Sequence, residues 1–230
     1  MIQFYQKSQY LLILESEMKK SLFILIIFLI AGCELKSPVQ EQIVPTENYD
    51  AIAAEGWTIF TGGAYDSALV VFDSVIVQDP ENTSARVGRA WCLLMQADVD
   101  TTDSRFYLQA AESDSNWFAD ARCGGIIIDF QWSEWVKCIA AVDELLAAAP
   151  QYVFKYHPQI DWHDMRVIQA QSHYFTKNYE QAWATLEELN PGFQLDPDAS
   201  ETWIVDGVTY FSFEAALSKA IEMMSQRYSE

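Results

Sequence analysis

The sequence predicts an all-α fold in which helical hairpins stack into a solenoid, completed by a small β-hairpin and a C-terminal capping helix. Apolar residues recur every three or four positions in successive stretches, which is the spacing of one helix face. Gly62-Gly63 and Asp79-Pro80 interrupt two of these stretches, because Gly and Pro end helices. Residues 85–88, Ala-Arg-Val-Gly, recur as Ala-Arg-Cys-Gly at 121–124, a period within the roughly 20–50 residues typical of repeat proteins.

The first predicted hairpin covers residues 49–82. Its inward-facing residues are Ala53, Trp57 and Phe60 in the first helix, and Tyr65, Ala68, Phe72 and Val75 in the second. Gly56 lies on a neighbouring face, where the missing side chain lets the next helix approach closely. Two helices of about four turns cannot bury enough apolar surface alone, so this hairpin must stack against others.

This pattern resembles the tetratricopeptide repeat (TPR) family, whose signature combines small residues in the first helix, a Gly–Tyr turn, and an Ala and an aromatic residue in the second helix. Ile52 and Glu55 stand where that signature has Trp and Leu, so the match rests on Gly56, the turn and the second helix. The resemblance covers residues 49–191 and implies helical repeats with a groove that binds protein partners.

Three further hairpins are predicted along the chain. The second has a helix over 83–97 and a weakly patterned partner over 104–111, the third runs over 117–150, and the fourth ends at Pro191 after a longer connection over 151–161. Asp206-Gly207 favours a two-residue β-hairpin turn between 203–205 and 208–210. Residues 213–224 then form an amphipathic helix that caps the stack.

The N-terminal region predicts export and lipid attachment. Residues 1–32 are interpreted as a signal segment with Met18 as the true start, because Lys19-Lys20 precede an apolar run shorter than the ~20 residues that span a bilayer. Residues 30–33 resemble the lipobox of bacterial lipoproteins, which implies lipid attachment at Cys33. Residues 33–47 then form a tether, 48–191 the repeat domain, and 192–230 the β-hairpin and capping helix.

The same resemblance places the chain in a bacterial cell envelope, anchored by lipid. Glu34, instead of Asp, follows the anchoring cysteine and favours the outer membrane, on its periplasmic or its outer surface. A formal net charge of −19 argues against nucleic acid as a partner, because phosphate backbones would be repelled.

Catalysis and cofactor binding are not predicted, because phosphate-loop, dinucleotide, nucleophile-elbow and zinc-helix motifs are absent from the sequence. His157, Asp161, His163 and Asp164 could hold a metal, but their spacing matches no established site and favours a hydrogen-bonded loop. Cys92, Cys123 and Cys138 are interpreted as buried thiols, with a Cys92–Cys123 disulfide left as an alternative.

The resemblance assigns the partner-binding groove to the first helix of each hairpin. The predicted groove residues are Trp57, Phe60, Trp91, Leu94, Ile127, Phe130, Gln171 and Tyr174. Aromatic anchors beside acidic residues favour a basic or amide-rich peptide. The alternative for Trp57, Trp91 and Phe130 is a place in the core between repeats.

The function predicted from these features is a non-catalytic scaffold, anchored by lipid, that binds another envelope protein or peptide. Its outline is similar to the helical-repeat lipoprotein of the machinery that assembles outer-membrane proteins. Two alternatives are a surface glycan-binding lipoprotein, because eight Trp residues could stack on sugars, and an enzyme that uses the cluster around His163.

Overall fold

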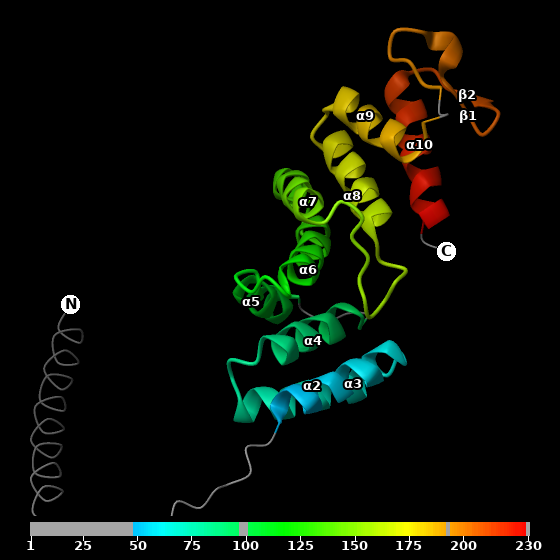
Figure 1. Ribbon diagram of the computed structural model, residues 1–230. Coiled ribbons are helices and arrows are strands. Elements are labelled where there is room, and N and C mark those ends of the chain that lie inside the picture. The colour runs from blue at the N-terminus through cyan, green and yellow to red at the C-terminus, as the bar shows by residue number, and fades with distance from the viewer. Residues whose placement is uncertain (1–47, 97–100, 192–193, 229–230) are drawn as a thin grey trace, which may run out of the picture. The chain divides into compact units, whose positions relative to one another are not determined.

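The computed structural model describes residues 48–96, 101–191 and 194–228 (Figure 1). The predicted signal segment, the lipid-bearing Cys33 and the tether over 33–47 lie outside the described residues. The elements, in chain order, are α2 (Tyr49–Thr61), α3 (Tyr65–Gln78), α4 (Thr83–Leu94), α5 (Thr102–Ala111), α6 (Phe118–Gln131), α7 (Trp135–Ala148), α8 (Trp162–Phe175), α9 (Tyr179–Leu189), β1 (Ile204–Val205), β2 (Val208–Thr209) and α10 (Phe213–Tyr228).

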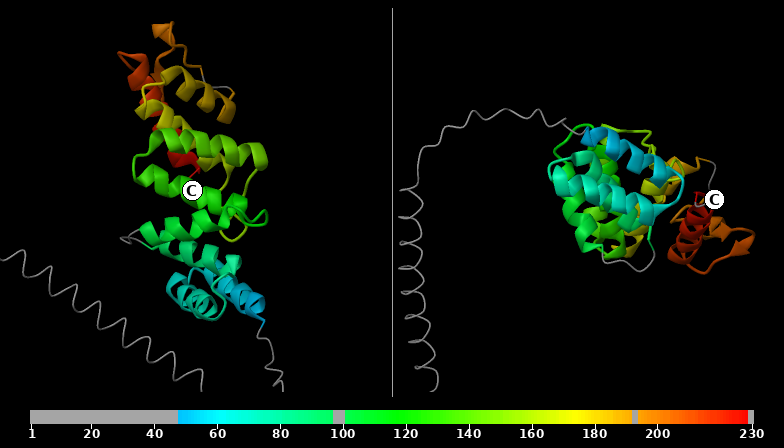
Figure 2. Two further views of the ribbon diagram at one scale, coloured as in Figure 1. Left: turned by 90° about the vertical axis from the view of Figure 1, so that its left-hand side faces the viewer. Right: turned by 90° about the horizontal axis from the view of Figure 1, so that it is seen from below.

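The helices form four hairpins, each packed against the next in chain order, as Figures 1 and 2 show. In each hairpin the first helix contacts the second, and the first helices of hairpins 1 to 4 also contact one another: α2 with α4, α4 with α6, and α6 with α8. The predicted all-α solenoid is confirmed. No helix within the described residues is both long and apolar enough to cross a bilayer.

Three of the hairpin turns share one backbone geometry. Gly63, Ser133 and Lys177 have φ values of 78°, 61° and 62°, so each lies in the left-handed region. Each also donates its backbone N–H to a carbonyl in the last turn of the preceding helix, which is how a helix end is closed. Gly tolerates this conformation at little cost, whereas Ser and Lys carry a steric penalty there.

The close approach predicted at Gly56 is confirmed, and Gly88 repeats it. The ring of Phe72, on α3, lies between α2 and α4. A Cβ added at Gly56 would lie 2.7 Å from Phe72 Cε1, and one added at Gly88 would lie 2.3 Å from Phe72 Cζ. These two glycines therefore make room for the ring that joins hairpins 1 and 2.

The C-terminal elements also follow the prediction. Val205 and Val208 pair across a two-residue turn in which Asp206 and Gly207 have φ values of 52° and 74°. The helix α10 packs on α8 and α9 and takes the place that the first helix of a fifth hairpin would occupy. Its apolar residues Leu217, Ile221 and Met224 close a second core with those of α9.

Candidate functional site

The connection between α7 and α8, residues 151–161, is the feature that reshapes the predicted groove, and we call it the strap. In Figure 1 it extends from the α7–α8 end of the stack to α4. Phe154 stacks on Trp91 with ring centroids 4.0 Å apart, and Tyr156 stacks on Trp57 at 3.9 Å. The strap therefore lies on the first helices of hairpins 1 and 2, on the surface that we call the inner face.

Three of the predicted groove residues are buried beneath the strap and among neighbouring rings. Trp57, Phe60 and Trp91 are 2%, 1% and 0% exposed, so no partner can reach them in this structure. The indole N–H groups of the two tryptophans also have hydrogen-bond acceptors inside the fold. Trp57 donates to Ser84 Oγ at 3.1 Å, and Trp91 donates to the Asp120 carbonyl at 3.2 Å. In this structure these rings therefore have the core position of the alternative, and it is the strap that lies on Trp57 and Trp91.

Two predicted groove residues, Gln171 and Tyr174, line an open groove between α8 and α10 with a volume of about 440 Å³. We call it the α8–α10 groove. Its remaining lining residues are Phe175, Ser218, Ile221, Glu222, Ser225 and Gln226. Phe175 is 52% exposed, so the groove offers a large apolar ring to solvent. Two serines of α10 keep one wall low, because their side chains are short.

A second hollow, of about 360 Å³, lies at the start of α8 and includes the predicted groove residue Ile127. It is also lined by Met95 directly after α4, Ile160 of the strap and Tyr228 at the end of α10. The strap thus forms one wall of the surface that stays open.

The other two predicted groove residues occupy intermediate positions. Leu94 is half-buried and packs beside Gly124, where an added Cβ would meet Leu94 Cδ1 at 3.3 Å. Phe130 is also half-buried and meets the ring of Trp135 edge-on at 5.2 Å. Trp135 in turn stacks on Phe175 at 4.5 Å, so a chain of rings connects Phe130 to the α8–α10 groove.

Each of these two surfaces has one carboxylate among its lining residues, Glu222 in the groove and Asp164 in the hollow. No Lys or Arg is among the residues that line either one. Glu222 already attracts one cation of its own helix, since Lys219 Nζ lies 2.9 Å from Glu222 Oε1. A basic group of a partner would find the same attraction.

The cluster of His and Asp residues predicted around His163 lies at the end of the strap and the start of α8, where it caps the helix. Asp161 caps the helix by accepting from the His163 backbone N–H at 2.7 Å, and Asp164 accepts from the Asp161 N–H at 2.9 Å. The His163 ring lies between Trp162 and Tyr228, at 3.7 and 4.5 Å. Burial raises the pKa of Asp164. Within the described residues, no group of three or more His, Cys, Asp or Glu is placed to share a metal ion.

The three cysteines within the described helices are free thiols. Cys92 and Cys123 belong to α4 and α6, so the disulfide considered between these helices is not formed. Burial raises the pKa of Cys92 to about 12 and that of Cys138 to about 11, and it raises that of Cys123 further. Such thiols stay protonated and unreactive at neutral pH.

Sequence reasoning missed the strap as a functional element and treated it as a long connection. The available signal was the alternation Tyr152, Phe154, Tyr156, which places three aromatic side chains on one side of an extended segment.

Comparison with known proteins supports the fold. No family model matches the sequence, and no curated protein matches it. Two solved structures of MamA share the fold. A point mutant superposes with a TM-score of 0.51 at 11% identity, covering 79% of this chain and 91% of that chain. A second structure, "MamA MSR-1 C2", gives 0.52 at 13% identity, covering 78% and 97%. The chain therefore has a TPR-like solenoid fold.

Proposed function

We propose that this chain is a non-catalytic scaffold of a bacterial cell envelope, anchored by lipid at Cys33, that binds a segment of another envelope protein. The supporting observation is an open groove, lined by an exposed aromatic ring and one carboxylate, on a TPR-like solenoid, a fold consistent with protein partners. The α8–α10 groove contains predicted groove residues that a partner can reach, whereas the strap covers Trp57 and Trp91 on the inner face.

The groove favours a partner segment with an apolar side chain next to a basic one. Phe175 and Ile221 supply apolar contact, while Gln171 and Glu222 supply an amide and a carboxylate. Exposed aromatic rings in a groove are the usual anchors of binding energy. The carboxylate adds selectivity against acidic segments.

Photo-crosslinking in intact cells tests the scaffold role. A photoreactive residue at Ser225, inside the groove, should cross-link a specific protein, whereas one at the exposed Ser74 of α3 should not. Cross-linking to no protein at Ser225, or to the same proteins at both positions, would remove the groove from the proposal.

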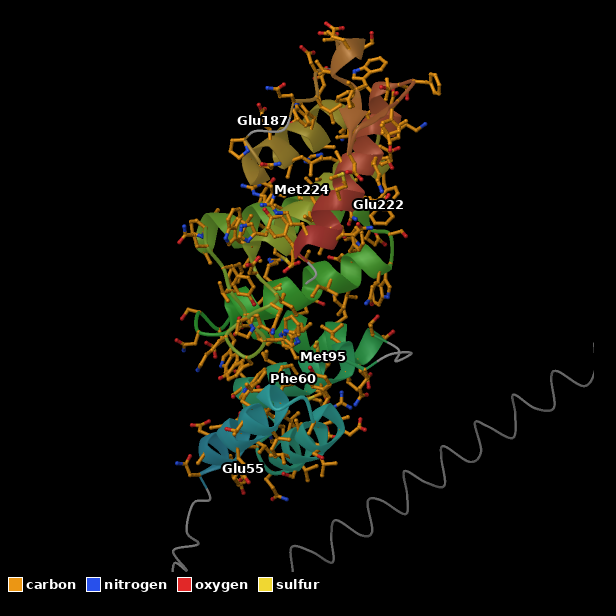
Figure 3. All side chains as sticks on the ribbon, turned by 90° about the vertical axis from the view of Figure 1, so that its right-hand side faces the viewer. Glu55, Phe60, Met95, Glu187, Glu222 and Met224 are labelled. Carbon is orange, nitrogen blue, oxygen red and sulfur yellow. The ribbon has the colours of Figure 1, made fainter. Side chains whose placement is uncertain are left out.

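Charge reversal then tests the preference for basic segments. Glu222→Lys should reduce the cross-link about tenfold, because it replaces an attraction with a repulsion. Glu187→Lys makes the same change on α9, outside the groove, and should leave the cross-link unchanged; Figure 3 shows the two residues on different sides of the stack. Equal effects would mean that only net charge matters.

The anchor has a separate test. The chain expressed from its first residue should partition into detergent with the membrane fraction, and Cys33→Ser should release it. Partition that does not change with this substitution would contradict lipid attachment at that residue.

A further inference from the structure

The strap meets the inner face as an extended segment with alternating sides. Tyr152 and Phe154 are 5% and 0% exposed and Tyr156 is half-buried, whereas the intervening Val153 and Lys155 are exposed. A period of two is that of an extended strand, in which every second side chain points to the same side. The strap therefore directs the side chains of three alternate aromatic residues to the hairpins.

The strap's backbone bonds to itself and not to the hairpins it covers. Phe154 donates to the Ile160 carbonyl at 2.8 Å, Ile160 donates to the His157 carbonyl at 2.9 Å, and Val153 forms an antiparallel bridge with Asp161. Within the described residues, each backbone hydrogen bond of the strap stays between 149 and 165, and none reaches hairpins 1 and 2. Leaving the inner face would therefore break none of these backbone bonds.

The receiving surface is built by three different hairpins. Trp57 of hairpin 1 and Trp91 of hairpin 2 supply flat rings, whose planes lie 12° and 20° from those of Tyr156 and Phe154. Asp120 of hairpin 3 accepts the Tyr152 hydroxyl at 2.9 Å. This surface thus combines two stacking platforms with one hydrogen-bond acceptor, spaced to match alternate residues of an extended chain.

From this geometry we infer that the inner face of hairpins 1 to 3 is a recognition site for extended segments with aromatic side chains at alternate positions, and that the strap occupies it in cis. The ligand class is a peptide with aromatic residues at positions i, i+2 and i+4, with a hydroxyl on the first ring. The site is distinct from the α8–α10 groove, and the inference needs neither the lipid anchor nor the proposed scaffold role.

Because the strap occupies the site in cis, it determines the affinity that a competing segment needs in order to bind the inner face. A segment held at both ends has an effective concentration on the order of millimolar. A free peptide therefore binds the intact chain poorly, and the site becomes measurable only when the strap's own rings are removed.

The test uses the full chain with the triple substitution Y152S/F154S/Y156S, which removes all three aromatic side chains of the strap from the inner face and leaves Asp120 without its Tyr152 partner. A synthetic peptide of residues 151–160 should bind this variant and reach saturation below about 1 mM. Its affinity for the unsubstituted chain should be at least tenfold lower. Tryptophan emission should shift to longer wavelength in the variant and return toward its original position on binding. A control peptide with Ser at positions 154 and 156 should have no effect.

A second measurement covers the case in which the variant does not fold. Limited proteolysis of the unsubstituted chain should show trypsin cutting after Lys155, in the strap, at a lower free energy of opening than after Arg86 or Arg89 in α4. The inference is overturned if a helical variant does not bind the peptide, or if cutting after Lys155 occurs only through global unfolding.

Discussion

Adding one methyl group at Gly88 should destabilise the junction of hairpins 1 and 2. In Gly88→Ala the new Cβ would lie 2.3 Å from Cζ and 2.4 Å from Cε1 of Phe72, against an ordinary carbon–carbon contact of about 3.5–4.0 Å. The Phe72 ring is fully buried and already lies close to Gly56 on its other side, so it cannot move toward α2. The helices α3 and α4 must therefore move apart.

The size of the effect follows from two opposing contributions. Overpacking a core costs about 1–3 kcal/mol, while replacing Gly by Ala in a helix gains about 1 kcal/mol. We expect a net loss of up to about 2 kcal/mol in the free energy of unfolding, measured by urea denaturation followed by circular dichroism. Gly125→Ala is the matched control, because its Cβ would meet only the ends of two side chains, Arg105 Nη1 at 3.4 Å and Glu112 Oε1 at 3.9 Å, and it should be neutral or stabilising.

A double-mutant cycle tests the cause. Phe72→Leu shortens the side chain that Gly88 faces, so the two substitutions should partly compensate each other. The free energy of unfolding lost in G88A/F72L should be roughly 1–2 kcal/mol smaller than the sum of the losses in the two single variants. Additive losses, or a G88A variant as stable as the Gly125 control, would refute the assignment of this glycine to close packing.

Three further predictions concern the turns, a buried carboxyl and the thiols. Ser133→Gly should raise the free energy of unfolding by about 0.5–1 kcal/mol by removing a left-handed strain, and Gly63→Ser should lower it similarly, both by denaturation. Burial raises the pKa of Asp120 above its ordinary 3.8, so the stability it contributes is complete below that value and is lost as pH rises through the raised pKa. Asp120→Asn, which keeps the acceptor for Tyr152, should therefore be more stabilising at pH 7 than at pH 4 in urea denaturation, and the reverse order would contradict this sign. In a Cys33→Ser chain the three buried thiols should react with an aromatic disulfide reagent only after denaturation, and rapid reaction of any of them in the native chain would contradict their burial.

The hairpins could be predicted from sequence because their signals are local. Gly62-Gly63, Asp79-Pro80 and the small residues opposite Phe72 act within one hairpin or its neighbour, and each element that they delimit is present. The same holds for Asp206-Gly207, whose positive φ values define the β-hairpin turn. Local chemistry was therefore sufficient for the fold.

The candidate site could be predicted only in part, because access to it depends on contacts between distant residues. Gln171 and Tyr174 follow from the register of the fourth hairpin and do line an open groove. Trp57 and Trp91 have the same helical register, but their exposure is decided by Tyr156 and Phe154, far along the chain. Helical periodicity identifies which side of a helix a ring lies on, and not what covers that side.

The reach of the strap also bears on the order in which the protein can fold. In an ordinary solenoid each hairpin is completed by its neighbour, so folding can spread along the chain as it is made or exported. Here the ring surfaces of hairpins 1 and 2 lack their covering until residues beyond the third hairpin have emerged. The first hairpins to be synthesised are thus among the last to complete their packing. A chain that ends before residue 152 would expose the ring faces of Trp57 and Trp91 that the strap covers, and exposed apolar surface of this kind promotes aggregation.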